Sequence, residues 1–374
     1  MRKSETNKYK LLGINFIVLC FLFILPAATL NGYRGLKKLI FLFTSKSVFE
    51  DPRSTYPIYK NKEVTKQVFA ELNFLETEYK SFIGWRRKKT NQKYTNIKGN
   101  YYTRVSKGEN IKNSTWFFGG STIWGTGVGD SETIPSIFNE KTGFNVFNFG
   151  ESGWVARQSV NQLLNLISDG NIPYRVIFYD GVNDVISRCR SDYRKIAIHA
   201  REKKIASAIN NQRKPINYIS EIILEPYLKI KNLYNRKILT SSYDCHISLE
   251  KSKNVATYLV NDWFSAFLIS KAAEAKFYAI LQPTIFDNES NFEYFNSEEK
   301  SLLPIYKLQY ESVYPKIIEA IRTKCLIQKE FCNSFLNGTK WIPKDAKVFM
   351  DFCHLTKEGN TIIVDEIIKG ISNK

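Results

Sequence analysis

Strand-length apolar runs that alternate with helical stretches constrain the fold of this chain more than any other feature. The runs, each ended by a turn signal, occupy residues 115–120, 145–150, 175–181, 276–283 and 347–351. Helical spacing of apolar residues predicts helices near 131–141, 157–168, 257–275, 297–324 and 360–371. Because the runs are continuously apolar, they indicate parallel strands buried on both faces. The sequence therefore predicts a three-layer α/β/α sandwich around a five-stranded parallel sheet.

A basic segment interrupts this alternation after the third predicted strand. Residues 188–237 are helical in pattern and hold 13 Lys and Arg against 4 Asp and Glu, a net charge of +9. The whole chain carries +18, so half of its excess charge lies here. We interpret the region as a basic helical insertion, spanning about 186–256, at the carboxyl edge of the sheet.

The sequence of the amino-terminal region predicts a membrane anchor. A short basic tail, 1–10, precedes 20 positions without a charge, 11–30. At a rise of 1.5 Å per residue, a helix of this length spans a hydrocarbon core of about 30 Å. The basic tail favours an amino end inside the cell and the rest of the chain outside the cytoplasm. Signal-peptide cleavage after Ala27, Ala28 or Thr29 is the alternative.

After this single-pass signal anchor, the chain divides into two further parts. Residues 31–110 form a juxtamembrane and N-terminal extension, polar and aromatic, with short strands and turns. Residues 111–374 form the main α/β domain, including the insertion.

Composition limits the classes of partner. The net charge of +18 and a pI near 9.4 suggest a polyanion: nucleic acid, anionic lipid or an acidic glycan. No zinc-finger spacing, phosphate-binding loop or basic helix leading into heptads is present, so we expect no nucleic acid and no cofactor. Apolar residues make up 43% of the chain and aromatic residues 14%, which excludes general disorder.

Cysteine and histidine are sparse. Outside the cytoplasm, Cys189 with Cys245 and Cys325 with Cys332 are candidate disulfides, and free buried thiols are the alternative. No CxxC pair occurs, and the chain has only three histidines, so we expect no metal site.

Small and polar residues follow four of the predicted strands. The motif "GGST" contains Ser121, "FGESG" contains Gly150, "GVND" contains Asn183, and "DFCH" contains Asp351 and His354. Open α/β sheets place their ligand sites at the carboxyl ends of the strands. We therefore expect these residues to meet at one edge of the sheet.

The residue types at these strand ends fit nucleophilic catalysis. A serine hydroxyl becomes a good nucleophile only when a base takes its proton, and an acid beside that base orients it. His354 has Asp351 three residues before it, whereas His199 and His246 have no acid at that offset. We predict a triad of Ser121, His354 and Asp351.

In order and placement, these motifs resemble those of the SGNH, or GDSL-type, hydrolase superfamily over about residues 115–371, without the insertion. The resemblance implies a flavodoxin-like sheet and an oxyanion hole built from the backbone amides of Ser121 and Gly150 and the side-chain amide of Asn183. Gly120 stands where the usual Gly-Asp-Ser motif of the family has Asp, but that Asp is not the acid of the triad. The "FGGST...GTG" form is similar to membrane-anchored bacterial hydrolase and O-acyltransferase members.

The resemblance implies a serine-dependent hydrolase or O-acyltransferase for O-acyl groups, chiefly O-acetyl, of a cell-envelope or exported glycan. Water and a sugar hydroxyl stay open as acceptors. The expected partners are an acylated glycan or small acyl ester, the membrane through the N-terminal helix, and a membrane acyl-donor protein. The alternative is a catalytically silent SGNH-like domain that binds an anionic polysaccharide or scaffolds a membrane assembly.

Other polar residues near the motifs have plainer expectations. Arg201, Lys203 and Lys204 of the insertion are candidate substrate contacts, with a solvated helical face as the alternative. We expect Asp180, Asp184 and Cys353, next to the predicted site residues in sequence, to be structural.

Overall fold

The computed structural model describes residues 50–191 and 243–373 without 107, 109 and 289–291, together with Asn15. The described residues of 50–191 and 243–373 belong to one compact unit. Apart from Asn15, the predicted anchor at 11–30 lies outside the described residues, and so does most of the predicted insertion.

Arg201, Lys203 and Lys204 lie outside the described residues. Within the ranges that are described, no helix is both long enough and apolar enough to cross a membrane.

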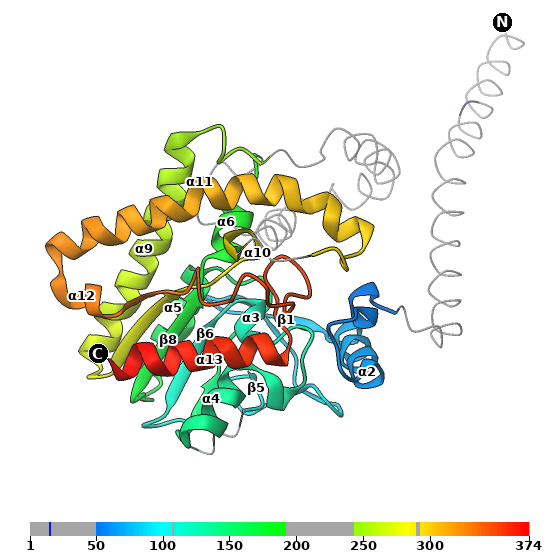
Figure 1. Cartoon of the computed structure of the whole chain (residues 1–374). Helices are drawn as coiled ribbons and strands as arrows, with labels where there is room; N and C mark the ends of the chain where they lie inside the picture. The colour runs from blue at the N-terminus through cyan, green and yellow to red at the C-terminus, as the bar shows by residue number, and fades with distance from the viewer. Residues whose placement is uncertain are drawn as a thin grey trace, which may run out of the picture. The chain divides into compact units, whose positions relative to one another are not determined.

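Five parallel strands form the core of one sheet (Figure 1). They are β6 (Thr115–Gly119), β7 (Val146–Asn148), β8 (Arg175–Asp180), β9 (Lys276–Leu281) and β10 (Phe335–Asn337). Their spatial order, β7-β6-β8-β9-β10, is the 2-1-3-4-5 order of flavodoxin-like doubly wound sheets. Every residue of β6 and β8 is buried, as expected of parallel strands covered on both faces.

The sheet is mixed, which corrects the prediction of a five-stranded parallel sheet. Beyond β7 it continues through β5 (Thr103–Arg104), β4 (Asn96–Lys98) and β3 (Thr90–Asn91), all paired antiparallel. Strands of two or three residues with polar side chains leave no apolar run in the sequence. A separate hairpin pairs β1 (Thr77–Lys80) with β2 (Gly84–Arg87).

The fifth parallel strand was predicted at 347–351, and that position is wrong. Val348, Phe349 and Met350 are buried, which explains their apolar character, but the segment forms only an isolated bridge between Phe349 and Leu355. The strand is β10, which follows α12 (Lys329–Asn333) and is too short to show as an apolar run.

Helices cover both faces of the sheet and give the predicted three layers (Figure 1). Trp116, Phe118 and Phe178 share one core with α5 (Ala156–Ser168), α9 (Leu249–Ala272) and α11 (Ser297–Ile327). Phe117 and Ile177, the alternate strand positions, share a second core with α4 (Ile134–Thr142) and α13 (Lys357–Ser372). The five predicted helices are confirmed, with α9 beginning at Leu249 rather than near 257.

Side-chain caps fix where several helices begin. Asn61, Thr133, Ser248 and Asn296 each accept a hydrogen bond from an amide in the first turn of α2 (Lys62–Asn73), α4, α9 and α11, respectively. The remaining short helices are η1 (Pro52–Thr55), α3 (Ser121–Trp124), η2 (Asp130–Glu132), α6 (Val182–Arg188) and α10 (Ile285–Asn288).

Both candidate disulfides are present. Cys189 is bonded to Cys245, and Cys325 to Cys332, while Cys353 is free and buried. The first bridge ties the end of α6 to the chain just before α9, across the predicted insertion. Arg190 and Tyr243 pair as an isolated antiparallel bridge beside it.

Candidate active site

Two glycines shape the turn that carries Ser121. Gly119 ends β6 with φ of 155°, and a Cβ there would collide with the Tyr179 carbonyl. A Cβ on Gly120 would collide with the side-chain amide nitrogen of Asn183. The Asn183 amide therefore lies against the residue before Ser121, which gives a local reason for glycine where the related motif has Asp.

A short turn after β10 carries the other triad residues. The Met350 amide donates to the His354 carbonyl at 2.9 Å, and the Thr356 amide donates to the Val348 carbonyl at 2.9 Å. Inside this turn, Asp351 Oδ1 accepts the amides of Cys353 at 3.0 Å and His354 at 2.8 Å. These two backbone contacts orient the Asp351 carboxylate independently of the contacts that its other oxygen, Oδ2, makes.

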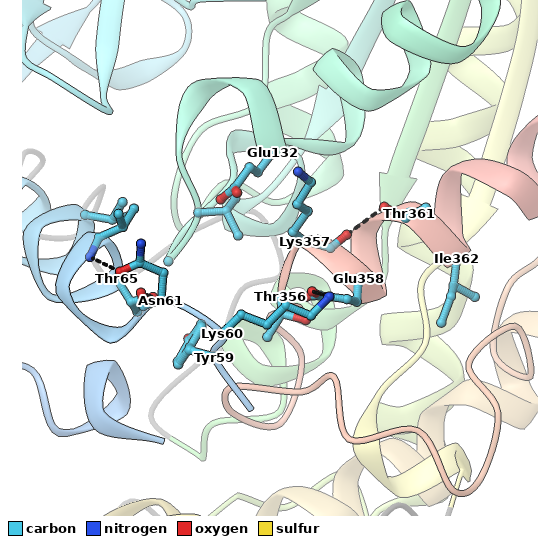
Figure 2. A pocket seen from close by; sticks show the side chains of 14 residues that line it. Tyr59, Lys60, Asn61, Thr65, Glu132, Thr356, Lys357, Glu358, Thr361 and Ile362 are labelled. Atoms are coloured by element: carbon cyan, nitrogen blue, oxygen red, sulfur yellow. Dashed lines mark hydrogen bonds and ion pairs between the residues drawn. The ribbon is translucent and has the colours of Figure 1, made fainter. Parts of the chain in front are cut away.

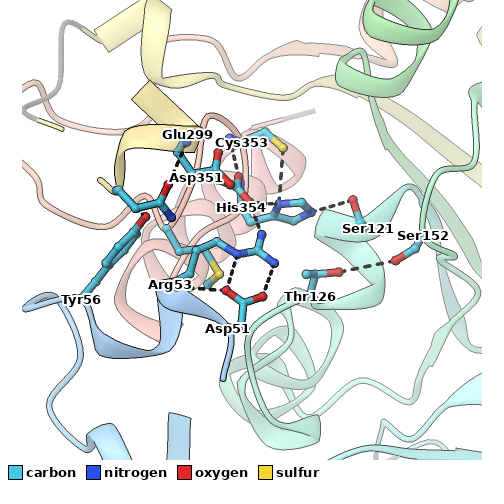
Figure 3. A network of polar contacts seen from close by, with 12 residues as sticks. Asp51, Arg53, Tyr56, Ser121, Thr126, Ser152, Glu299, Asp351, Cys353 and His354 are labelled. Atoms are coloured by element: carbon cyan, nitrogen blue, oxygen red, sulfur yellow. Dashed lines mark hydrogen bonds and ion pairs between the residues drawn. The ribbon is translucent and has the colours of Figure 1, made fainter. Parts of the chain in front are cut away.

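The structure brings the predicted triad together (Figure 3). His354 Nε2 lies 2.7 Å from Ser121 Oγ, across 233 positions of sequence, and His354 Nδ1 lies 2.6 Å from Asp351 Oδ2. The His354 side chain is 14% exposed and that of Asp351 is 4% exposed. A partly accessible serine and histidine backed by a buried carboxylate form the arrangement of a general-base-activated nucleophile.

Charge around the turn keeps Asp351 ionised. Burial alone would raise the pKa of Asp351, but His354 and the Arg53 guanidinium outweigh it and hold this pKa well below its usual range. Burial and the nearby Asp351 carboxylate raise the pKa of the Cys353 thiol well above its usual value. Cys353 therefore stays protonated, which fits its expected structural role.

The proposed oxyanion donors differ in their availability. The Ser121 amide stands at the start of α3, where amides lack intrahelical partners. Asn183 Nδ2 donates to the Trp154 carbonyl at 2.8 Å, which leaves its second hydrogen free for another acceptor. The Gly150 amide donates to Asn148 Oδ1 at 3.0 Å, so it would have to share or exchange this partner. The oxyanion-hole assignment stays a prediction.

Arg86 of β2 braces the loop after β7, and no sequence motif indicates this role. This arginine, 2% exposed, donates to the carbonyls of Phe149 at 3.2 Å and Tyr102 at 3.0 Å and lies 4.8 Å from the Trp154 ring. Burial lowers its pKa to about 10. The hydrogen bond to Phe149 and the cation–π contact with Trp154 hold the segment that contains Gly150.

Arg104 of β5 braces the loop after Ser121 in the same way. It is fully buried and donates to the carbonyls of Trp124 at 2.9 Å and Val128 at 2.6 Å, and also to that of Gly125. Asp130 accepts from its Nε at 2.8 Å and neutralises it. A single arginine thus satisfies three carbonyls of the loop that begins at the nucleophile.

Buried acids lie behind Asn183. Asp184 accepts the Ala156 amide at 3.1 Å and pairs with Arg188 at 3.4 Å, while Asp180 accepts the Trp263 indole at 3.1 Å. Burial, partly opposed by Arg188, raises the pKa of Asp184 to about 6. Both carboxyls bond to the scaffold, in agreement with the structural roles expected for them.

Within the described ranges, Asp351, Cys353 and His354 form a group of potential metal ligands whose ligand atoms all lie within 4.8 Å of one another. Both oxygens of Asp351 are already engaged by His354, Arg53 and backbone amides, and the Cys353 thiol is protonated. We assign no metal to these residues.

A pocket of about 540 Å³ lies between α2 and the start of α13 (Figure 2). Its lining combines apolar residues of α2 with an ion pair between Lys60 and Glu358, 3.1 Å apart. None of the triad residues lines it. We therefore do not place the reacting ester in this pocket.

No protein-family model matches the sequence, and no curated protein matches it. Solved structures do. One from Veillonella parvula, described as a member of the lipolytic G-D-S-L family, is 11% identical over 68% of this chain and 96% of its own, with a TM-score of 0.38. The chain is similar to GDSL-type proteins.

Two esterases are also among the similar structures. Est24, a carbohydrate acetylesterase from Sinorhizobium meliloti, is 12% identical over 70% of this chain and 99% of its own, with a TM-score of 0.37. The acetyl xylan esterase AlAXEase is 10% identical over 69% and 98%, with a TM-score of 0.30. At such low identity, the chemistry of this chain has to be inferred from its own side chains.

Proposed function

We propose that this chain is a serine-dependent esterase of the SGNH type that acts on O-acyl groups, chiefly O-acetyl, of a cell-envelope or exported glycan. The observation that carries the proposal is the continuous hydrogen-bonded line from Ser121 through His354 to Asp351, at 2.7 and 2.6 Å. O-acyl transfer by the same site is the finer alternative, in which a sugar hydroxyl replaces water.

Acylation follows from the tautomer that this line requires. For Ser121 to donate to His354 Nε2, the ring hydrogen of His354 must sit on Nδ1, where Asp351 accepts it. Ser121 Oγ then attacks the acyl carbon, its proton passes to Nε2, and the carbonyl electron pair moves onto the oxygen. Collapse of this intermediate breaks the ester bond, and the leaving sugar oxygen takes the proton from Nε2.

Deacylation uses the same groups in reverse. A water molecule or a sugar hydroxyl gives its proton to His354 Nε2 and attacks the acyl carbon of acyl-Ser121. Ser121 leaves with the proton from Nε2, which restores the starting state. Asn183 and the Ser121 amide would bind the oxyanion in both steps, each donor contributing roughly 3 kcal/mol to the transition state.

For the location, we propose a single-pass membrane anchor at 11–30 with the domain outside the cytoplasm. The uncharged length of that segment supports the anchor. The two paired disulfides support an oxidising compartment, because cytosolic thiols are kept reduced. Reporter fusions at residue 60 that are active only in the cytoplasm would contradict this location.

A fluorophosphonate probe tests the proposed activity. Such a probe reacts covalently with serines that a base activates, so we expect labelling of Ser121, its loss in Ser121→Ala, and turnover of p-nitrophenyl acetate by the wild-type chain. A folded wild-type chain that neither labels nor turns over the ester would instead favour the catalytically silent binding domain.

A further inference from the structure

The triad acid has a second cationic partner that comes from the N-terminal extension. Arg53 Nη1 donates to Asp351 Oδ2 at 2.8 Å, across 298 positions of sequence. This is the same oxygen that accepts from His354 Nδ1 (Figure 3). Together with the two amides on Oδ1, these bonds occupy the four lone-pair sites of the carboxylate.

Arg53 is itself held in place by several contacts. Asp51 accepts its Nη2 at 2.8 Å and its Nε at 3.1 Å, a two-pronged pair that fixes the plane of the guanidinium. The guanidinium lies 5.1 Å from the Phe69 ring, and the side chain is 21% exposed. With two donors committed to Asp51, Nη1 is left directed at Asp351. A lysine has no such fork and cannot make both contacts in this geometry.

We propose that Arg53 is a positioning residue of the triad, which locks the Asp351 carboxylate in the plane that His354 requires and opposes the positive charge that develops on His354. This inference rests on the proposed function of the triad. It assigns to the extension a part in the chemistry that no strand-end motif indicates.

The charges around the triad decide the sign of the effect. Besides Arg53, the titratable groups that interact electrostatically with Asp351 come from the extension, from the 294–299 segment and from the turn itself: Tyr56, Tyr59, Tyr294, Glu299, Cys353 and His354. Asp51 acts on Arg53 and Glu299. Burial and the nearby Asp351 raise the pKa of Glu299 to about 7. Arg53 is the fixed cation of this group, so its removal should favour the imidazolium form of His354.

The first readout is the pH dependence of fluorophosphonate labelling of Ser121 in the full chain. Labelling requires neutral His354, so in Arg53→Met we expect the acid-limb midpoint to rise by about one pH unit. Misplacement of the carboxylate should also lower the plateau rate, and kcat for p-nitrophenyl acetate, roughly 10-fold to 100-fold with little change in KM. Arg53→Lys should recover part of the midpoint shift and little of the rate.

A paired variant and a matched control sharpen this test. Asp51→Asn removes an anion instead of a cation, so the acid-limb midpoint of Ser121 labelling should fall below that of the wild type. This variant serves as the second test if Arg53→Met fails to fold. Arg157 also pairs with a buried aspartate, Asp262, at 2.6 Å, but makes no contact with the triad. Arg157→Met should leave the midpoint unchanged.

Nuclear magnetic resonance separates this inference from the proposed activity. The chain has only three histidines, so the ring resonance of His354 can be assigned with a His354→Gln variant and titrated without any substrate. If wild-type Ser121 does not label, the proposed function fails, yet the His354 titration midpoint still tests Arg53. Folded Arg53→Met with wild-type midpoint and plateau would reduce Arg53 to a tether and overturn the inference.

Discussion

The carboxyl edge of the parallel sheet and the N-terminal extension contribute to the same site in different ways. The sheet edge supplies the groups that would touch substrate, and each stands directly after a buried strand or in the turn before α13: Ser121, Asn183 and His354. The extension supplies cations that touch those groups or their loops: Arg53, Arg86 and Arg104. The first region provides the reacting atoms, and the second fixes their positions.

The difference shows in what each region bonds to. At the sheet edge the decisive contacts join side chains, as in the line from Ser121 to Asp351. In the extension, two buried arginines mostly donate to backbone carbonyls of the loops, whatever side chains those loops carry. If this division holds, substitutions at the sheet edge should abolish or strongly reduce turnover. Substitutions in the extension should reduce turnover less, because they only loosen the loops that carry the reacting groups.

Ser121→Ala should give the largest effect. It deletes the nucleophile and leaves only the binding and oxyanion contributions, so turnover of p-nitrophenyl acetate should fall by about 10⁴-fold or more. The side chain is small and partly exposed, so the midpoint of thermal unfolding should stay near that of the wild type. Unchanged turnover in this variant would remove Ser121 from the chemistry and with it the first half of the comparison.

Asn183→Ala should come next. The Asn183 amide lies against Gly120 and keeps one free hydrogen, so its loss should lower kcat roughly 100-fold to 1000-fold. KM should change much less, because an oxyanion donor acts chiefly in the transition state. An increase in KM with kcat unaltered would make Asn183 a substrate-positioning residue instead.

Arg104→Met tests the bracing role of the extension. The variant removes the guanidinium donors of three carbonyls and the cation that pairs with Asp130, which keeps only its bonds from Asn96, so we expect a loss of about 3–5 kcal/mol in the free energy of unfolding. Because the loop after Ser121 loosens, kcat should fall about tenfold. Urea unfolding and steady-state kinetics on p-nitrophenyl acetate measure the two effects.

Arg175 offers the matched control for Arg104. It is also buried, at 6% exposure, but it starts β8 at the opposite end of the strand from Asp180 and lies 5.1 Å from the Phe144 ring. Arg175→Met should keep kcat within about twofold of the wild type. Equal losses of kcat in both variants would mean that any buried arginine matters alike, and the extension would have no special part.

The residues at the sheet edge could be predicted from the sequence, and those of the extension could not. Ser121 and His354 follow long apolar runs or a strand-like segment, so sequence alone placed them at one edge. The five helices were likewise predicted from periodicity, whereas the flavodoxin-like sheet was implied only by the family resemblance. β10 was missed because a strand of three residues is too short to show a periodic pattern. The segment 347–351 resembles a strand in the sequence because it is apolar and buried, although it forms only an isolated bridge.

The arginines could not be predicted, for a physical reason. Arg86 and Arg104 bond to carbonyls, which every residue has, so no partner residue type marks the contact in the sequence. Arg53 bonds to Asp351 across 298 positions, with no motif around it. The strands that carry Arg86 and Arg104 are four and two residues long, and a basic, polar stretch of sequence resembles a solvated extension until its burial is known.

The smallest expected effect concerns the basic insertion, which lies outside the described residues and for which the charge count alone argues. We propose that it binds a negatively charged glycan or lipid surface. Replacing Arg201, Lys203 and Lys204 with Gln should lower activity on an acetylated acidic glycan by several-fold at low salt. Exposed charges are screened beyond about 8 Å at physiological ionic strength, so the difference from the wild type should shrink as salt rises.

The substrate pair and a charge-matched variant complete this test. Turnover of p-nitrophenyl acetate, a small neutral ester, should be unaffected, because it has no charge for the insertion to attract. Arg322, Lys307 and Lys329 are exposed on α11 and α12 and provide the same change in net charge when replaced with Gln. If the control variant weakens glycan turnover as much as the insertion variant does, the effect belongs to the overall charge of +18 and not to a recognition element. Equal responses to both substrates would likewise exclude selective binding of a polyanion.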